Sequence, residues 1–289
     1  MPIHIPVLVR EVLEGFKSVE TNGLIVDCTL GMGGHSKALL KKGYRVIGID
    51  RDENAIDKAK ENLKDFKNIL FVHDNFINLR KILNKLKVKK VSGILVDLGV
   101  SSYQLEDESR GFGFTGKLDM RMDSNQKLTA EKVVNEYSED KLKKVLFDYG
   151  EKSFAGVIAR KIVENRKKKR IESAEELFEI VKNCMPGKYR YSREHHWATP
   201  TFRALRIEVN NDIENILNFE FLDCLEDGGI LEVISFHSIE DDIVKNKFIQ
   251  LEKEKKIEIL TEKPIEASPE EVKFNVKSLR AKLRIVKKI

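Results

Sequence analysis

The segment Leu24-Ile25-Val26-Asp27-Cys28-Thr29-Leu30-Gly31-Met32-Gly33-Gly34-His35 decides the fold of this chain. Its apolar beginning predicts a buried strand, and its glycines let the backbone turn sharply and approach a ligand at the start of a helix. A turn rich in glycine is also an ordinary structural turn, so the segment alone does not identify a ligand. A dinucleotide fingerprint would require glycine at position 36, where this chain has Ser36.

Short apolar runs alternate with amphipathic stretches on both sides of this turn, which indicates a parallel sheet covered by helices. The predicted strands are Leu24–Cys28, Arg45–Ile49, Ile69–Val72 and Gly93–Asp97. The predicted covering helices are Ser36–Lys41, Glu53–Leu63 and Asn78–Leu86. Right-handed crossovers between such strands predict a doubly wound, Rossmann-like α/β sheet.

The pattern changes after Asp97, where a loop rich in glycine and serine leads into a long stretch with helical periodicity and no convincing strand. Strand character returns in three runs, at Ile230–Phe236, Ile257–Leu260 and Ala281–Val286. We therefore predict one α/β domain made of residues 1–105 and 201–289. Residues 106–200 are predicted to form an inserted, all-helical domain.

The composition is that of a globular chain with a heavily charged surface. Charged residues make up 34% of the 289 residues, against roughly 25% in an average domain. No apolar stretch approaches the roughly 20 residues of a membrane span, and the start lacks the layout of a signal peptide, so we expect a cytoplasmic protein. The three cysteines are far apart in the sequence, which argues against a disulfide framework and against a metal site.

Two acidic residues at predicted strand ends give the glycine turn a chemical meaning. Asp50 closes the second strand, where a carboxylate can accept both hydroxyls of a ribose, so nucleoside binding becomes the leading hypothesis. Dehydrogenases share this feature. The end of the fourth strand distinguishes them, because methyltransferases place polar groups that face the substrate there, and this chain has Asp97 followed by Leu98-Gly99-Val100-Ser101-Ser102.

Together these strings resemble the MraW type of bacterial methyltransferase, the ribosomal RNA small-subunit methyltransferase H family, over nearly the whole chain. The strings that carry the resemblance are His4-Ile5-Pro6-Val7-Leu8, Gly31-Met32-Gly33-Gly34-His35-Ser36, Asp50-Arg51-Asp52, Asp97-Leu98-Gly99-Val100-Ser101-Ser102, Gln104-Leu105, Arg110-Gly111-Phe112, Leu118-Asp119-Met120-Arg121-Met122-Asp123, Ala204-Leu205-Arg206-Ile207-Glu208-Val209-Asn210 and Ile234-Ser235-Phe236-His237-Ser238.

The resemblance implies a class I methyltransferase fold that binds S-adenosylmethionine, and it assigns the cofactor contacts. The residues it implies are Gly33, Gly34 and His35 in the first loop, Asp50 at the ribose, Phe76 beside the adenine, and Asp97 and Gln104 near the methionine end. Physical chemistry agrees for most of them, since a carboxylate suits a ribose or a positively charged group and an aromatic face suits adenine. For Phe76, packing in the core explains the residue equally well.

One segment departs from the pattern expected of the family, which is His-Pro-Ala-Thr-Arg-Thr-Phe-Gln. Here the segment reads His196-Trp197-Ala198-Thr199-Pro200-Thr201-Phe202-Arg203, so proline replaces an arginine and Arg203 replaces a glutamine. Proline also biases the residue before it, Thr199, toward extended backbone.

The resemblance further implies the substrate, the exocyclic N4 amine of a cytidine in the decoding region of 16S ribosomal RNA. We expect this RNA within an assembled small subunit, and naked RNA stays open as the alternative acceptor. Residues 160–206 support a polyanionic partner, because they hold 13 Lys or Arg against 6 Asp or Glu, a surplus above the whole chain's +5. Within them, residues 165–170 are a basic run, and in residues 188–193 cations alternate with tyrosines. We therefore predict that the insertion recognises RNA, although a charge run is also typical of a solvated helix face.

For the chemistry, we predict Asp97 and Ser101 as the hydrogen-bond acceptors that hold the amine in line with the methyl group. The chain has no Asp-Pro-Pro-Tyr loop of the kind many amino methyltransferases use at this place. His237 also lies at a predicted strand end, where a structural role explains it as well as a chemical one.

Three other hypotheses stay open at this point. A nicotinamide-dependent oxidoreductase would bind NAD in place of S-adenosylmethionine. A non-catalytic RNA-binding protein would need a damaged cofactor loop, whereas Gly31, Gly33, Asp50 and Asp97 are all present. A base-flipping DNA methyltransferase would prefer duplex DNA as the methyl acceptor.

Overall fold

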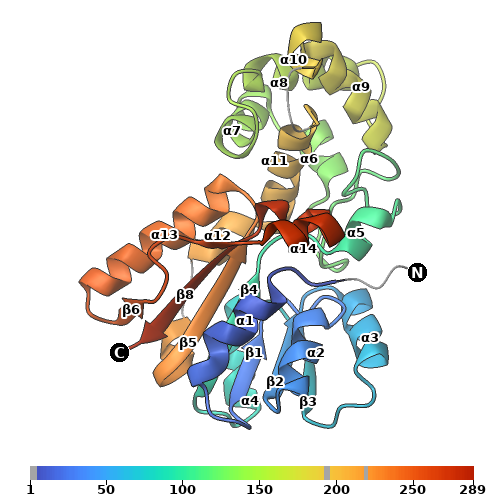
Figure 1. The fold of residues 1–289 in the computed structure, drawn as a ribbon. Helices are drawn as coiled ribbons and strands as arrows, with labels where there is room; N and C mark the ends of the chain where they lie inside the picture. The colour runs from blue at the N-terminus through green and yellow to red at the C-terminus, as the bar shows by residue number, and fades with distance from the viewer. Residues whose placement is uncertain (1–4, 192–195, 218–220) are drawn as a thin grey trace. The chain divides into compact units, whose positions relative to one another are not determined.

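The computed structural model of the chain describes residues 5–191, 196–217 and 221–289 (Figure 1). His4 of the first string above, and Ser192 and Arg193 of the second basic segment, lie outside these ranges. The chain divides into two compact units. Unit 1 consists of Met1–Gly99 with Glu214–Ile289, and unit 2 of Val100–Ile213.

Unit 1 is built on one sheet, whose strands run in the order β3-β2-β1-β4-β5-β8-β6, with β7 paired to β8 (Figure 1). The pairs among β1 to β5 are parallel, whereas β8 runs antiparallel to its neighbours. This order confirms the predicted doubly wound fold of a class I methyltransferase. The strands are β1 (Leu24–Asp27), β2 (Arg45–Asp50), β3 (Ile69–His73), β4 (Val91–Asp97), β5 (Leu225–Ser235), β6 (Ile257–Ile259), β7 (Ile265–Glu266) and β8 (Lys282–Lys288).

Two strands differ from the sequence prediction for a visible reason. β5 begins at Leu225, ahead of the predicted Ile230, because the exposed residues 226–228 interrupt the apolar pattern while the backbone is already paired. β7 was not predicted, since a strand of two residues carries no readable alternation.

Two apolar layers hold the sheet between helices. Neighbouring strand residues point to opposite faces, so Ile25 joins one layer and Val26 the other. The first layer contains buried residues of α1, α2 and α3, and the second contains those of α4, η3 and α13. The helices of this unit are α1 (Val9–Gly15), η1 (Phe16–Ser18), α2 (Gly34–Lys41), α3 (Glu53–Asn62), η2 (Phe76–Asn78), α4 (Leu79–Lys85), η3 (Phe221–Cys224), α13 (Ser238–Lys253), α14 (Pro269–Phe274) and η4 (Val276–Arg280), and α12 (Asp212–Leu217) begins just before the boundary.

Unit 2 is helical, and within its described residues, 100–191 and 196–213, the only strand-like pairing is a single bridge between Lys117 and Ser173. Its core forms where α7 packs against α8 and α11. Because α11 packs on α7 and α6, unit 2 extends to Ile213, beyond the predicted boundary after residue 200. The helices are α5 (Ser102–Glu106), α6 (Ala130–Glu136), α7 (Glu139–Tyr149), α8 (Ala155–Arg166), α9 (Ala174–Cys184), α10 (Gly187–Tyr191) and α11 (Thr199–Asn210).

Among the helices of the described residues, none combines the length and the apolar character that crossing a bilayer would demand.

Candidate active site

Three aspartates end adjacent parallel strands of unit 1. Asp27 closes β1, Asp50 closes β2 and Asp97 closes β4. Since β2, β1 and β4 are neighbours and run in the same direction, all three carboxyl groups lie at the same edge of the sheet. We call this edge the carboxyl edge. It is where open α/β sheets bind their ligands.

Asp50 is fastened to the glycine turn. The backbone N–H of Gly31 donates to Asp50 Oδ2 at 2.7 Å, and that of Asp52 donates to Oδ1 at 2.9 Å. Burial raises the pKa of Asp50 to about 6, against the opposing effect of these two hydrogen bonds. Each carboxylate oxygen has a second lone pair. The side chain can therefore still accept the two hydroxyls of a ribose.

Glycine is needed at positions 31, 33 and 34 of the turn for different physical reasons. A Cβ at Gly33, which has φ +82°, would lie 2.6 Å from Leu63 Cδ1, and one at Gly34 would lie 2.9 Å from Pro6 Cγ. Packing within the protein thus requires these two glycines. Gly31 has φ +52°, but a Cβ there would meet only the Thr29 carbonyl oxygen at 4.0 Å. Gly31, which was not among the predicted contacts, is the glycine with space beside it for a ligand.

Asp97 has one carboxylate oxygen that accepts no hydrogen bond from the described residues. Its backbone N–H donates to Thr29 Oγ1 at 2.6 Å, which ties the end of β4 to the glycine turn. Its Oδ1 is buried, and no described residue offers it a hydrogen bond. Burial raises the pKa of Asp97 to about 6, and His35 acts in the opposite direction. A buried acceptor without a partner fits a positively charged or hydrogen-bonding ligand group.

His35 lies next to Asp97 and is 6% exposed. Its Nε2 is 2.8 Å from the carbonyl oxygen of Val7. Because a carbonyl can only accept, Nε2 carries the hydrogen, which leaves Nδ1 facing Asp97 Oδ2 at 3.8 Å. His35 thus connects the N-terminal segment to Asp97.

Two residues of this network were not predicted as site residues. Asp27 is buried and its Oδ2 accepts the hydroxyl hydrogen of Ser36 at 2.7 Å, and burial raises its pKa. Thr29 holds Asp97, as described above. Asp27 shares the signal that marked Asp50 and Asp97, an acidic residue close to the end of a predicted strand, whereas Thr29 carries no signal of its own.

Phe76 is 8% exposed and sits among the apolar residues of the second layer. Its ring packs against Phe221, with centroids 5.9 Å apart. The structure therefore places Phe76 in the core. Its contact with an adenine stays a prediction.

Ser101 and Gln104 belong to unit 2, where they satisfy each other. Ser101 precedes α5, and its Oγ accepts the backbone N–H of Gln104 at 3.2 Å. Gln104 Oε1 in turn accepts the backbone N–H of Ser101 at 3.0 Å, which completes a capping box. The structure thus gives both side chains a structural task. Their predicted roles in catalysis and in cofactor binding stay predictions.

His237 precedes α13 and is bound to Glu240. Its Nδ1 accepts the backbone N–H of Glu240 at 3.3 Å, and its Nε2 lies 2.7 Å from Glu240 Oε1. The structural explanation of His237 is therefore favoured.

Three cations of the first basic run of unit 2 form internal contacts. Arg166 donates to the Val134 carbonyl at 2.7 Å, Lys169 pairs with Glu176, and Arg170 pairs with Glu131 at 2.7 Å. Lys167 and Lys168 are exposed.

Of the two tyrosines in the second basic segment, Tyr189 is engaged in internal contacts. Its hydroxyl donates to Glu151 at 2.6 Å, and its ring packs edge-on against Phe154.

The departures from the family pattern fall in α11. This helix starts at Thr199 despite the following proline, because a proline in the first turn needs no hydrogen-bond donor. The expected extended backbone at Thr199 was therefore wrong. Arg203 Nε donates to the Tyr149 carbonyl at 3.3 Å and joins α11 to α7.

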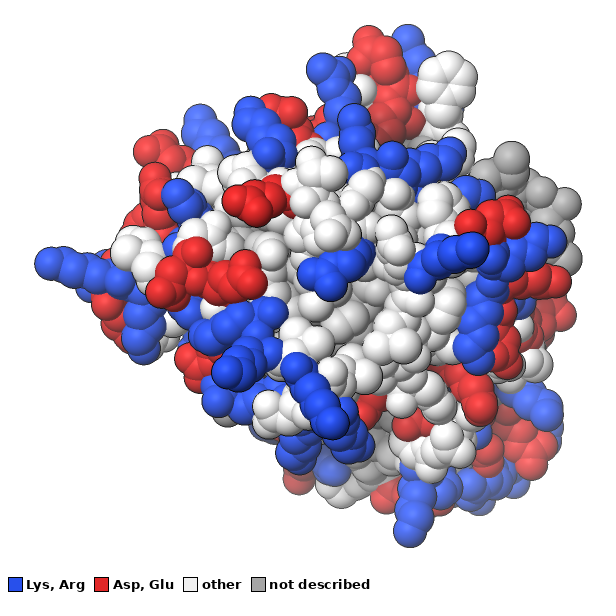
Figure 2. Space-filling model, turned by 90° about the horizontal axis from the view of Figure 1, so that it is seen from below, with Lys and Arg blue, Asp and Glu red and all other residues white. Residues whose placement is uncertain are grey.

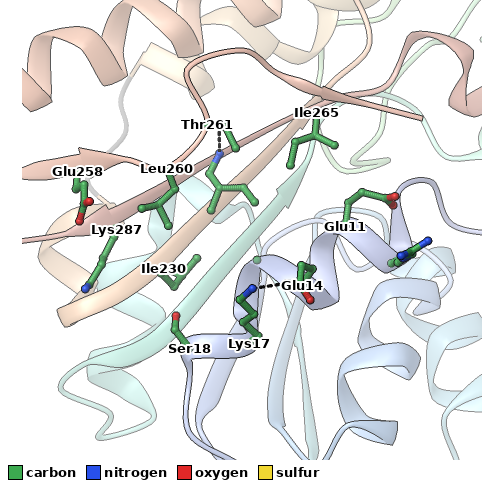
Figure 3. Close-up of a pocket in the computed structure, with 13 residues that line it drawn as sticks. Glu11, Glu14, Lys17, Ser18, Ile230, Glu258, Leu260, Thr261, Ile265 and Lys287 are labelled. Atoms are coloured by element: carbon green, nitrogen blue, oxygen red, sulfur yellow. Dashed lines mark hydrogen bonds and ion pairs between the residues drawn. The ribbon is translucent and has the colours of Figure 1, made fainter. Parts of the chain in front are cut away.

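A separate pocket of about 600 Å³ lies beside α1, between this helix and the last strands of the sheet (Figure 3). It is lined by Lys17 and Glu14, which pair with each other, and by Ile230, Leu260 and Lys287 among others. None of the predicted site residues lines it. In the described parts of the chain, no three His, Cys, Asp or Glu side chains are grouped so that they could hold a metal ion.

The charges on one face of the molecule are mixed. Figure 2 shows lysines and arginines interspersed with aspartates and glutamates around a largely uncharged centre. This is the ordinary pattern of a solvated surface.

Comparison with known proteins gives the family. The sequence pattern of the MraW methylase family matches residues 1–289. The chain belongs to this family. It is 47% identical to the ribosomal RNA small subunit methyltransferase H of Clostridium botulinum (strain Kyoto / Type A2) over 309 residues, and 50% identical to the protein of the same name from Persephonella marina over 293 residues. Each alignment covers 99% of both chains.

Membership confirms the sequence-based prediction of the family and of an S-adenosylmethionine-dependent methyltransferase. It excludes the oxidoreductase hypothesis. The geometry above agrees with that cofactor, because Asp97 Oδ1 is a buried acceptor without a partner in the described residues and Gly31 leaves open space beside Asp50.

Proposed function

We propose that this chain methylates the exocyclic N4 amine of a cytidine in the decoding region of 16S ribosomal RNA, within an assembled small subunit in the cytoplasm. The names and full-length coverage of the two relatives support a small-subunit RNA substrate. The single structural observation that carries the proposal is the buried Asp97 Oδ1 at the carboxyl edge, which has no hydrogen-bond partner among the residues that the structure describes and lies at the strand end next to the one that carries the glycine turn.

We propose the following cofactor contacts. Asp50 accepts the ribose hydroxyls, and the open space at Gly31 admits the ligand. Asp97 lies near the methionine end, where its buried Oδ1 accepts a hydrogen bond or faces a positive charge. His35 lies against Asp97, with its Nδ1 3.8 Å from Asp97 Oδ2. Gly33 and Gly34 allow the turn to pack closely against Leu63 and Pro6. When bound, S-adenosylmethionine supplies a methyl group on a positively charged, electrophilic sulfur.

The substrate amine sets the chemical demands on the protein. The lone pair of a cytosine amine is delocalised into the ring, so the amine must be held in line with the methyl group, and positioning provides most of the rate. The nitrogen gains a methyl group and loses one proton. Because that proton becomes acidic as the nitrogen acquires charge, a weak base suffices. A carboxylate at the position of Asp97, with its pKa raised to about 6, meets this need.

Transfer of a labelled methyl group to purified small ribosomal subunits tests the proposal, with digestion to nucleosides to identify the modified base. We expect label in N4-methylated cytidine, and label in adenosine or uridine would contradict the proposed base. The variant Asp97→Asn serves as the inactive control. Duplex DNA in the same assay tests the base-flipping alternative, which label in DNA in preference to the subunits would favour.

Isothermal titration calorimetry of the folded protein with S-adenosylmethionine provides an independent test of the site. We expect binding that is lost in Asp97→Ala and weakened in Asp50→Ala. An absence of heat with the parent protein, together with no competition by S-adenosylhomocysteine, would refute the proposed site.

A further inference from the structure

Residues 273–280, the end of α14 and the η4 turn, form a surface segment with an inverted pattern. The apolar side chains face solvent: Phe274 is 83% exposed, Val276 71% and Leu279 60%. The polar side chains of Asn275 and Ser278 are buried instead. A cluster of exposed large apolar groups is unusual on a protein surface and indicates a binding site.

Hydrogen bonds stabilise the buried positions of Asn275 and Ser278. Ser278 Oγ donates to the Asn275 carbonyl at 2.7 Å, and Asn275 Nδ2 donates to the Ile5 carbonyl at 3.0 Å. The buried polar groups are thus satisfied, and the outward position of the three apolar side chains follows from well-formed contacts.

The same segment is basic. Lys273, Lys277 and Arg280 are all exposed, and the segment contains no aspartate or glutamate. Lys273 and Arg280 form no ion pair with any described residue, unlike Lys169 and Arg170 in unit 2. The surface therefore presents positive charge beside an exposed aromatic ring.

The segment is connected to the carboxyl edge through the N-terminal residues, which lie alongside α14 (Figure 1). Glu271 of α14 accepts the backbone N–H of Leu8 through its Oε1, at 2.8 Å. Pro6 packs on Gly34 of the glycine turn, and the Val7 carbonyl accepts from His35. The segment thus contacts the N-terminal residues, and these in turn contact the glycine turn.

We propose that residues 273–280 bind a single-stranded stretch of the RNA substrate, with Phe274 stacked on an unpaired base and the three cations on phosphates. Cations interleaved with an exposed ring are the combination that binds single strands. A second copy of this chain fits less well, because a two-fold contact would bring the same cations against each other. This inference rests on the proposed RNA substrate and adds a binding surface outside the insertion.

Three variants test the surface. Phe274→Leu keeps an apolar side chain but removes the ring, and Phe274→Tyr retains a stacking face. The triple variant Lys273→Gln, Lys277→Gln, Arg280→Gln removes the charge. Its matched control is Lys81→Gln, Lys85→Gln, Lys89→Gln, three exposed lysines on and after α4, which precedes the amino end of β4.

Fluorescence anisotropy with a labelled oligocytidylate measures the binding. We expect Phe274→Leu to weaken the Kd roughly 10-fold, within the range known for stacking on one base, and Phe274→Tyr to restore it. The basic triple variant should also flatten the slope of log Kd against log salt by about 2, since about 0.7 counterions are released for each phosphate contact with a single strand. The control triple variant should leave the slope nearly unchanged.

Methylation of small subunits provides the second measurement. We expect the Phe274→Leu and basic triple variants to raise KM with little change in kcat, and to keep the parent's affinity for S-adenosylmethionine by calorimetry, which also shows that they fold. Parent-like RNA binding and KM in both variants would overturn the inference while leaving the proposed function intact.

Two further outcomes would distinguish the inference from a protein or lipid partner and from a failure of the proposed function. A change in oligomeric state by light scattering, or in binding to anionic phospholipid vesicles, without a change in RNA affinity would show a protein or lipid partner and overturn the inference. A parent protein that binds subunits but transfers no methyl group contradicts the proposed function alone, since the effect of the variants on binding is still measured.

Discussion

The carboxyl edge of the sheet and the start of α5 both carry residues predicted for the site, but their side chains are in opposite states. At the edge, Asp97 has a buried oxygen with no partner among the described residues, and burial raises the pKa of both Asp50 and Asp97 to about 6. At α5, Ser101 and Gln104 bind each other's backbone in a capping box.

The two groups of side chains should therefore respond differently to a ligand. A capping box is stable by itself and stabilises its helix whether or not a ligand is present. Burial destabilises the charged form of the Asp50 and Asp97 carboxylates, and a positively charged or hydrogen-bonding ligand lowers their free energy. We therefore expect substitutions at the edge to change ligand binding, and substitutions at α5 to change stability first.

The largest effect should come from Asp97. We expect Asp97→Asn to weaken S-adenosylmethionine binding at least about 30-fold, since losing one partner of a buried charged contact costs roughly 2–5 kcal/mol. The unliganded variant should be more stable at pH 8, by at most about 3 kcal/mol, because it no longer buries a carboxylate whose pKa is raised from 3.8 to about 6. Calorimetry and urea unfolding measure the two changes, and a loss of both affinity and stability would contradict this account.

The two glycines of the turn offer a matched pair. Gly33→Ala should destabilise the fold by more than about 2 kcal/mol, because its Cβ meets Leu63 at 2.6 Å and its φ of +82° is unfavourable. Gly31→Ala has space for its Cβ, so the cost should be about 1 kcal/mol of backbone strain, with a clear loss of affinity for S-adenosylmethionine. Thermal unfolding and calorimetry distinguish them. Equal affinity in Gly31→Ala and the parent would show that no ligand approaches Gly31.

The affinity for S-adenosylmethionine should depend on pH. Burial raises the folded-state pKa of Asp97 to about 6, so the carboxylate that faces the ligand is lost as the pH falls below that value. From pH 7 to pH 5 we expect the Kd to weaken about 10-fold, as for one group that must be deprotonated. The contribution of Asp97 to the stability of the unliganded protein follows the opposite trend and declines as the pH rises from about 4 through 6. The Asp97→Asn variant should show a flatter Kd profile, and an unchanged profile would assign the dependence to another group.

The smallest effect should come from the capping box. Ser101→Ala removes a hydrogen bond to the Gln104 backbone, and we expect a loss of about 1 kcal/mol in the free energy of unfolding, with Ser101→Thr close to the parent. The affinity for S-adenosylmethionine should change less than threefold, which corresponds to about 0.6 kcal/mol. A kcat reduced 100-fold or more in Ser101→Ala, with Ser101→Thr active, would instead support its predicted role in catalysis.

The order of the elements and the chemistry at the strand ends could be predicted from the sequence. Apolar runs such as Val46–Ile49 mark buried strands because a sheet covered on both faces has no place for polar side chains. The turn after Cys28 and the carboxylate of Asp50 lie at the ends of two consecutive predicted parallel strands, so the sequence predicted that they meet at one edge of the sheet. The motifs also identified the family, because they occur in one order along the full length.

Which polar groups can still bind a ligand depends on contacts that form in the folded protein. Ser101 and Asp97 look alike as sequence signals, yet one is satisfied by a residue three positions away and the other has no partner among the described residues. The exposure of Phe274 was equally unreadable, since whether a side chain faces water depends on contacts such as that of Asn275 with Ile5, at the other end of the chain. Local patterns fix backbone elements, whereas hydrogen-bond satisfaction and burial are set by residues that the fold brings together from distant positions.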